Sequence, residues 1–334
     1  METNAIIDRL HEGRLSRRAL TRALAAAGIG MVLQPLMARR AAAAEEITYF
    51  TWAEYEKPSL HQDYVKKYGG SPAVSLFGDE EEALQKIRGG YRPDIAHPCS
   101  YMVSRWHDAG VVKPLDVSRI EHWDDIWDVL KKVPQTYRSE ERWWVPWDWG
   151  NSSVIYRTDE VKDYGEDSWQ ILFDERYAGR LATYDVIDGA VIVAALVAGV
   201  EDPFNMNDAE IARTREMLRK QRPLLRFYWT DITAIEQGLA SGEIVAAYGW
   251  NSSVHLLRRQ GVPVAYMRPK EGILTWVCGM VLIEGSTGDE QAAYDLINAM
   301  LTPETGKVFV EEYGYGHSNR KTYERVSAET LANL

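Results

Sequence analysis

Aromatic side chains and carboxylates gather in this sequence where predicted strands end. The residues at those positions are Trp52, Tyr55, Tyr101, Asp185, Asp188 and Trp250. A flat aromatic face attracts an organic cation by about 1–2 kcal/mol once water is removed, and a carboxylate balances the charge. Of the 12 tryptophans, Trp147, Trp149 and Trp276 also lie at strand ends or beside Gly, Ser or Asn. Packing is the ordinary role of any one tryptophan, but this grouping predicts an aromatic box for an organic cation.

Asp185 and Asp188 are three residues apart, a spacing that places two side chains on one side of a helix. A desolvated ammonium group needs a carboxylate partner and acceptors for its three N–H donors, and such a pair supplies both. Aspartate is also a common N-terminal cap, so either residue is equally suited to cap a helix predicted over 188–198. The two roles are compatible, and the sequence leaves both open.

The motifs of common enzyme and metal-site classes are absent. The seven histidines are scattered without His-Glu-x-x-His spacing, and the two cysteines, Cys99 and Cys278, form no Cys-x-x-Cys pair. Gly-x-Ser-x-Gly, Gly-x-Gly-x-x-Gly and the Gly-x-x-x-x-Gly-Lys phosphate loop do not occur either. We therefore expect no catalytic residue, no cofactor and no metal.

The first 44 residues have the layout of a bacterial export signal. Adjacent arginines, Arg17 and Arg18, precede a mildly apolar stretch over 23–37, and an alanine block over 41–44 offers a processing site. The apolar stretch is too short to span a bilayer, and the arginine pair indicates the twin-arginine route. An amphipathic basic helix of a cytosolic protein is the alternative. Export to the periplasm by the twin-arginine machinery would exclude most ATP- or NADH-dependent intracellular enzymes.

The length and the net charge of the chain limit the number of domains and the kinds of molecule that it could bind. The chain has 334 residues, and the 290 that follow the signal suffice for one large or two medium domains. Residues 1–44 carry seven Lys/Arg and three Asp/Glu, so the formal net charge of −11 becomes −15 without them. Such an acidic surface repels nucleic acid and anionic lipid and attracts cations over long range. We expect a monomer that binds a cationic small molecule and no nucleic acid.

Predicted strands and helices alternate along the chain, which favours an α/β fold with parallel sheets. The first block has strands over 46–51, 73–77 and 94–97 and helices over 57–68, 79–89 and 100–109. The pattern restarts after Gly150, with strands over 154–156 and 180–184 and helices over 188–198 and 210–221. Two such blocks predict two lobes with a cleft between them. In open α/β sheets ligands bind outside the carboxyl ends of the strands, where the aromatic residues and carboxylates lie.

Several ordered segments resemble the spermidine/putrescine-binding proteins of polyamine ABC importers. These segments are 49–55, 93–101, 145–150, 242–250, 269–276, 296–303 and the pair Gly314-Tyr315. The resemblance implies a type II periplasmic binding protein, in which two lobes, each a mostly parallel sheet flanked by helices, close on a ligand. It implies a first lobe over 45–150 and 277–322 and a second over 151–272 and 323–334. The hinge would lie near 150–155 and 272–277, with a third crossing near Tyr323.

The resemblance also implies a ligand site and partners. It places Trp52, Glu54, Tyr55 and Tyr101 on the rim of the first lobe, and Ser100 is a further ligand-binding residue. Asp185 and Asp188 match the carboxylate pair that receives an ammonium group. Trp250, Trp276 and Tyr315 match the aromatic walls around the methylene chain, and Cys278 lies at a further site position. The partners implied are a small organic amine and the membrane-spanning subunits of an ABC permease.

Two positions depart from the family pattern. Cys278 and Ser253 occupy positions at which the family has carboxylates. A ligand with two ammonium groups needs charge compensation at both ends, because a buried unpaired ammonium costs several kcal/mol. Either Glu54, Asp79, Asp148 or Asp231 supplies the missing charge, or the ligand carries one ammonium group, as γ-aminobutyrate and choline do.

By the same resemblance Cys99 and Cys278 lie near the cleft on neighbouring strands. A disulfide beside the site is one expectation, and two partly buried free thiols are the alternative. The leading functional hypothesis is a periplasmic substrate-binding protein of an ABC importer. A ligand-sensing subunit of a membrane receptor and an exported enzyme with an unfamiliar motif remain the alternatives.

Overall fold

The fold is described from a computed structural model, which covers residues 47–162 and 164–333. The chain divides into one unit over residues 1–43 and a second over 44–334, and the second is described below. The predicted export signal over 1–44 lies outside the described residues. None of the described helices is both long enough and apolar enough to cross a membrane.

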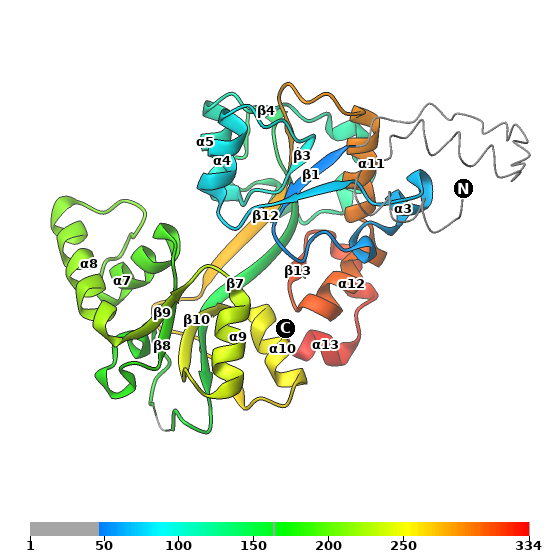
Figure 1. Cartoon of the computed structure of the whole chain (residues 1–334). Coiled ribbons are helices and arrows are strands. Elements are labelled where there is room, and N and C mark those ends of the chain that lie inside the picture. Colours follow the sequence, from blue (N-terminus) through cyan, green and yellow to red (C-terminus); the bar gives the residue numbers. More distant parts are fainter. Residues whose placement is uncertain (1–46, 163, 334) are drawn as a thin grey trace, which may run out of the picture. The chain divides into compact units, whose positions relative to one another are not determined.

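A single mixed sheet organises the described residues, with 11 strands and a main path of β2-β1-β3-β12-β7-β10-β8-β9 (Figure 1). The strands on this path are β1 (Thr48–Thr51), β2 (Ala73–Leu76), β3 (Ile95–Ala96), β7 (Val145–Arg157), β8 (Leu181–Tyr184), β9 (Leu225–Trp229), β10 (Ala246–Trp250) and β12 (Leu274–Ile283). Short strands at its sides are β4 (Val112–Lys113), β11 (Val264–Tyr266) and β13 (Gly316–His317), and β5 (Tyr137–Arg138) and β6 (Glu141–Arg142) form a separate hairpin.

The sheet consists of two halves built in the same way. In the first half β1 is parallel to β2 and β3, and β12 is antiparallel to β3. In the second half β8 is parallel to β9 and β10, and β7 is antiparallel to β10. The long strands β7 and β12 pair with each other, from Leu274 opposite Ser152 to Met280 opposite Val145. The α/β fold class predicted from the alternating elements is therefore confirmed.

Helices connect the parallel strands, which is why those strands can share one direction. The connecting helices are α3 (Gln62–Tyr68), α4 (Glu80–Arg88) and α5 (Ser100–Asp108) in the first half, and α7 (Ile192–Val197), α8 (Asp208–Gln221), α9 (Ile232–Ser241) and α10 (Asn251–Arg259) in the second. After β12 the chain forms α11 (Glu290–Met300) and α12 (Pro303–Tyr313), and α6 (Asp128–Lys131) and α13 (Ala328–Asn333) are short. The helix predicted over 79–89 agrees with α4 to within one residue at each end.

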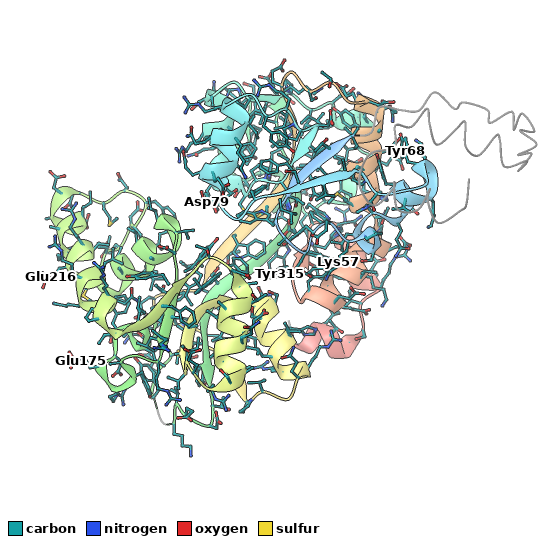
Figure 2. All side chains as sticks on the ribbon, viewed as in Figure 1. Lys57, Tyr68, Asp79, Glu175, Glu216 and Tyr315 are labelled. Carbon is teal, nitrogen blue, oxygen red and sulfur yellow. A yellow bond between two sulfur atoms is a disulfide. The ribbon has the colours of Figure 1, made fainter. Side chains whose placement is uncertain are left out.

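Apolar side chains fill both faces of the first half of the sheet. Successive residues of a strand point to opposite faces, so Tyr49 joins one core cluster and Phe50 another. The Tyr49 cluster contains side chains of α11 and α12, and the Phe50 cluster contains side chains of α4 and α5. A third cluster, around Trp169 and Ala247, fills the second half. Figure 2 shows side chains packed between the ribbons throughout.

Three segments differ from the elements expected. The helix expected over 57–68 is a short 3₁₀ helix, η1 (Pro58–Leu60), followed after His61 by α3. The strand expected over 154–156 is the last part of β7, which is 13 residues long. The helix expected over 188–198 begins as a π-helical turn, η6 (Ile187–Val191), and only then continues as α7.

The expected crossing over 150–155 lies on β7, and residues 274–277 of the one expected over 272–277 lie on β12; the two strands pair with each other from Ser152 opposite Leu274 to Val145 opposite Met280. The expected third crossing contains Tyr323, whose hydroxyl donates to the His317 carbonyl (3.0 Å) and accepts from its N–H (2.9 Å). These bonds attach this part of η8 (Arg320–Glu324) to β13. The lobe boundaries and the hinge stay predictions.

Candidate ligand-binding site

Trp52 and Glu54 lie in the turn that follows β1. The indole N–H of Trp52 donates to the His97 carbonyl (3.1 Å), and its ring packs on Phe77 with centroids 4.5 Å apart. Glu54 has a φ of 75°, a left-handed backbone conformation that residues other than glycine rarely adopt. Its carboxylate forms an ion pair with Lys57 and is 63% exposed. A ligand ammonium would therefore have to compete with Lys57 for Glu54.

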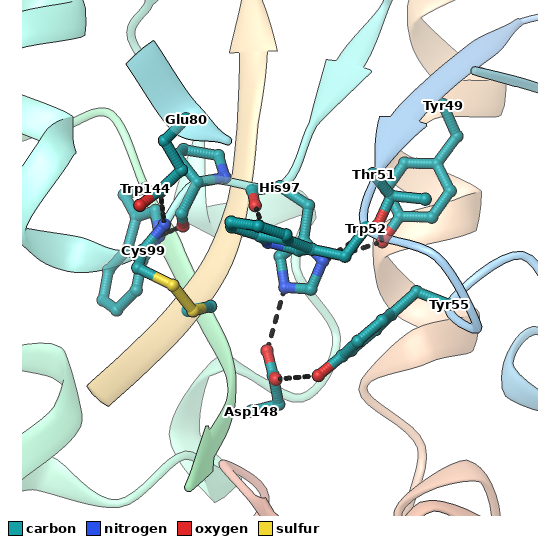
Figure 3. The surroundings of a disulfide bond; sticks show 11 residues. Tyr49, Thr51, Trp52, Tyr55, Glu80, His97, Cys99, Trp144 and Asp148 are labelled. Atoms are coloured by element: carbon teal, nitrogen blue, oxygen red, sulfur yellow. Dashed lines mark hydrogen bonds and ion pairs between the residues drawn. A yellow bond between two sulfur atoms is a disulfide. The ribbon is translucent and has the colours of Figure 1, made fainter. Parts of the chain in front are cut away.

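Tyr55 and Asp148, both predicted at the site, bind each other inside the protein (Figure 3). The Tyr55 hydroxyl donates to Oδ2 of Asp148 (2.9 Å), and Nε2 of His97 lies 2.9 Å from Oδ1. Burial, with the Asp148 charge next in importance, raises the pKa of Tyr55 well above its ordinary value, so the phenol remains a donor. Asp148 is fully buried and both of its oxygens have partners. Tyr55 is 8% exposed, so most of its ring is packed inside the protein, and its place on the rim of the first lobe stays a prediction.

The disulfide between Cys99 and Cys278 is present, and it joins β12 to the residue preceding α5. Both cysteines are buried, and the Cys99 N–H donates to the Glu80 carboxylate. Cys278 is bonded to Cys99, which leaves it no free thiol. Ser100 and Tyr101 form the first turn of α5, and Tyr101 is 46% exposed. Cys278, at the position where the resemblance implies a carboxylate, is thus bonded to the residue that precedes α5.

Asp185 and Asp188 follow the carboxyl end of β8. Asp185 is exposed, and its N–H donates to the Trp229 carbonyl (2.9 Å). Val186 occupies the N-cap position of η6, without a side-chain capping bond, so Asp185 does not cap this turn. Asp188 lies within η6, and its side chain is outside the described part of the chain.

The three predicted aromatic walls lie at the ends of β10 and β12 and after α12. Trp250 meets Tyr184 and Trp229 edge-on, with centroids 5.7 and 5.4 Å apart. Trp276 meets Tyr315 edge-on at 4.9 Å. Trp250 and Trp276, together with Trp52, pack against the core cluster that contains Tyr55 and Tyr315. The structure therefore brings these five predicted aromatic residues to one cluster, which does not include the predicted Tyr101.

The start of α10 connects the two sets of predicted residues. The side-chain oxygen of Asn251 accepts from the Asn151 N–H (3.0 Å), and its amide nitrogen donates to the Gly314 carbonyl. The Ser252 hydroxyl donates to the Tyr315 hydroxyl (2.7 Å). Tyr315 is buried, which raises its pKa, and the Asp148 and Glu236 carboxylates add to that rise.

Two further candidate acids act as helix caps. Asp79 accepts from the Glu82 N–H at the start of α4 (2.8 Å), and Asp231 accepts from the Thr233 N–H at the start of α9 (3.0 Å). Both residues satisfy backbone donors that the first turn of a helix leaves free. Among the described residues, no group of three or more His, Cys, Asp or Glu is arranged to hold a metal ion.

Reasoning from the sequence missed His97 and Glu236. His97 lies within a matching segment, but only the folded chain shows that it supports Asp148. Glu236, on α9, accepts from the hydroxyl of Ser253 (2.7 Å), one of the two positions that depart from the family pattern. The signal in the sequence was the departure at Ser253, whereas its partner lies 17 residues earlier on another helix.

The sequence is similar to those of bacterial proteins that bind small molecules. Residues 60–333 match the family model described as bacterial extracellular solute-binding protein. A putrescine/agmatine-binding protein of Pseudomonas aeruginosa is 28% identical, over 88% of this chain and 87% of its own length. A spermidine/putrescine-binding periplasmic protein of Haemophilus influenzae is 28% identical, over 84% of this chain and 78% of its own length.

Solved structures agree on the fold. A putative spermidine/putrescine ABC transporter protein from Listeria monocytogenes superimposes with a TM-score of 0.78 at 22% identity, covering 86% of this chain and 87% of its own. The two-lobe binding-protein architecture expected from the resemblance is thereby confirmed. From the match over residues 60–333 we conclude that the chain belongs to the family of bacterial extracellular solute-binding proteins.

Proposed function

We propose that this protein is the periplasmic substrate-binding component of an ABC importer and that it captures a polyamine such as putrescine or spermidine. The observation that carries the proposal is the packing of Trp52, Trp250 and Trp276 around one core cluster. The names of its relatives in Pseudomonas aeruginosa and Haemophilus influenzae support the same ligand class.

Binding would combine charge pairing with aromatic contact. Asp185 and Asp188 would receive an ammonium group as it loses its water, and Trp250 and Trp276 would cover the methylene chain. Closure of two lobes about β7 and β12 would exclude the remaining water. The ligand would pass to the permease unchanged, without catalysis. We also propose export by the twin-arginine machinery, a monomeric state and no nucleic-acid partner.

A second candidate ligand class has one ammonium group, as in γ-aminobutyrate or choline. The observation that favours it is the disulfide at Cys278, which occupies a position where the resemblance implies a carboxylate. A sensing role for a membrane receptor is compatible with either ligand class. Thermal-shift screening of putrescine, spermidine, cadaverine, γ-aminobutyrate and choline separates the classes, because a ligand that binds only the folded protein raises Tm.

Calorimetric titration of variants tests the site itself. Truncating one partner of a buried charge pair typically costs about 2–5 kcal/mol, so Asp185→Ala or Asp188→Ala should weaken binding about thirtyfold or more. Trp250→Ala should cost less, about 1–3 kcal/mol, since no charge is left unpaired. Asp63→Ala, which removes an exposed carboxylate paired with Lys66, is the matched control. Unchanged affinity in both Asp185→Ala and Asp188→Ala would refute this site, and recovery of chemically altered ligand would refute a transport role.

A further inference from the structure

Glu236 is a half-buried carboxylate without a cationic partner among the described residues. One oxygen accepts from the Ser253 hydroxyl (2.7 Å). Ser253 itself is fully buried, and its hydroxyl bond orients this oxygen of the carboxylate. Charged side chains in proteins are rarely removed from water without a partner, because desolvation is costly. A carboxylate held in this way is prepared for a cation that the protein does not supply.

The position of Glu236 follows from the topology of the second half of the sheet. Strands β10, β8 and β9 are parallel neighbours, so their carboxyl ends share one edge. Trp250 ends β10, Asp185 follows β8, and α9, which carries Glu236, starts just after β9. Ligands of open α/β sheets bind at this edge. Glu236 therefore joins the proposed carboxylate pair and the aromatic wall at the same edge.

Contacts made by α10 connect this edge to the core cluster in the first half of the sheet, which contains Tyr315. Ser253 holds Glu236, and the preceding residue, Ser252, donates to the Tyr315 hydroxyl (2.7 Å). Tyr313, near Tyr315, donates its hydroxyl to the Glu54 carbonyl (2.7 Å). Neighbouring residues of one helix thus hold Glu236 and Tyr315, a predicted wall of the ligand site.

From this arrangement we infer that Glu236 is a ligand-binding carboxylate that receives the second cationic group of a ligand with two cationic ends, an α,ω-diamine or an amine with a guanidinium group. The inference rests on the proposed function, since Asp185 and Asp188 receive the first group. Glu236 supplies a negative charge to the site, whereas Ser253 and Cys278, at positions where the family has carboxylates, do not. The inference therefore favours a ligand with two cationic groups over a ligand with a single ammonium group.

Electrostatics of the free protein support this role. Burial raises the pKa of Glu236, the charges of Asp231 and Glu54 add to that rise, and the Ser253 bond opposes it. Neighbouring negative charge that disfavours an ionised carboxylate also favours a cation placed beside it. The titratable groups that act on Glu236 are thus acidic, from the first half of the chain as well as from α9.

The test compares a diamine with a monoamine of the same carbon skeleton. Glu236→Gln keeps an acceptor for Ser253 but removes the charge, and putrescine and n-butylamine are titrated calorimetrically into the wild type and the variant. We expect putrescine affinity to fall about tenfold or more, with n-butylamine affinity within about twofold of wild type. Glu216→Gln is the control, because Glu216 is an exposed α8 carboxylate paired with Lys220 and lies far from Tyr315 in Figure 2.

The outcomes separate this inference from the proposed function. Tight putrescine binding by the wild type with unchanged affinity in Glu236→Gln would overturn the inference alone, as would equal losses for both amines. A wild type that binds no amine would overturn the proposed function and the inference with it.

Stability of the ligand-free protein provides a second measurement. The folded pKa of Glu236 is raised, so the folded chain binds this proton more readily than the unfolded chain and loses stability as pH rises above the ordinary glutamate pKa. We expect Glu236→Gln to raise the ligand-free Tm at pH 7, which also shows that the variant folds. A lower Tm would indicate a structural role for the carboxylate and overturn the inference.

Discussion

Several carboxylates that residue type suggests as ligand groups already have partners within the protein. Asp148 is fully buried between His97 and Tyr55, and Asp79 and Asp231 cap helices. Asp185 and Glu236 have no cation within 4 Å among the described side chains. Residue type nominates candidates, and only the partners of each side chain in the fold distinguish those still able to bind a ligand.

His317 should make the protein sensitive to acid. Its Nδ1 accepts from the Asn319 N–H (3.2 Å) and its Nε2 lies 3.1 Å from the Met300 carbonyl, so Nε2 carries the proton and the ring is neutral. Burial lowers the pKa of His317 from 6.5 to about 4. The unfolded chain takes up this proton first, so stability present above pH 6.5 is lost as pH falls toward 4, by about 3 kcal/mol.

Urea unfolding at pH 7, 5.5 and 4.5, with an NMR titration of the His317 ring, checks this prediction. A folded-state pKa of 6 or above for His317 would contradict the expected loss.

At the scale of elements, the disulfide between Cys99 and Cys278 links β12 to the residue that precedes α5 and should stabilise the folded protein. The bond closes a loop of 179 residues, for which chain entropy alone predicts a stabilisation of about 5 kcal/mol. We expect the denatured, unreduced protein to show no free thiol and reduction to lower Tm. Cys99→Ser/Cys278→Ser is the control, since its Tm should not respond to reductant. Two titratable thiols per denatured chain would show that the bond does not form.

The close approach of β7 and β12 should make Gly150 sensitive to substitution. Gly150 lies opposite Trp276, and a Cβ atom added at Gly150 would collide with the Trp276 ring. Gly150→Ala should displace the indole, lowering stability by about 1–3 kcal/mol and weakening putrescine binding. Gly70→Ala is the control, because a Cβ atom there meets open space. Wild-type stability and affinity in Gly150→Ala would mean that the two strands adapt without moving Trp276.

The helices and parallel strands were predictable, because their apolar spacing and end signals are local. Asp79 before α4 and Gly69 after α3 are such signals. The length of β7 was not predictable, because its polar middle, over 148–153, lacks an alternating pattern and extends only by pairing with β12 and β10. The Glu236–Ser253 contact depends on how two helices pack, which the spacing of residues along the chain does not reveal.

For the whole molecule, we predict the route of export from residues that lie outside the described fold. Arg17 and Arg18 lie outside the described residues, and their adjacency is the reason to expect the twin-arginine machinery. Replacing both by lysine keeps the charge of the segment but removes the pair, so precursor should accumulate in the cytoplasm. Fractionation followed by immunoblotting measures this, with Arg9→Lys/Arg14→Lys as the control. Normal periplasmic protein from Arg17→Lys/Arg18→Lys would exclude this route.

The disulfide also has a topological consequence. Residues 99–278 form a covalently closed ring, which contains all of the predicted second-lobe stretch over 151–272. Exposed loops are the preferred sites of proteolysis, and Phe204, in a loop between α7 and α8, is 81% exposed. A single cut there opens the backbone but leaves both fragments joined through sulfur. The nicked protein would migrate as one species until a thiol reductant releases two fragments.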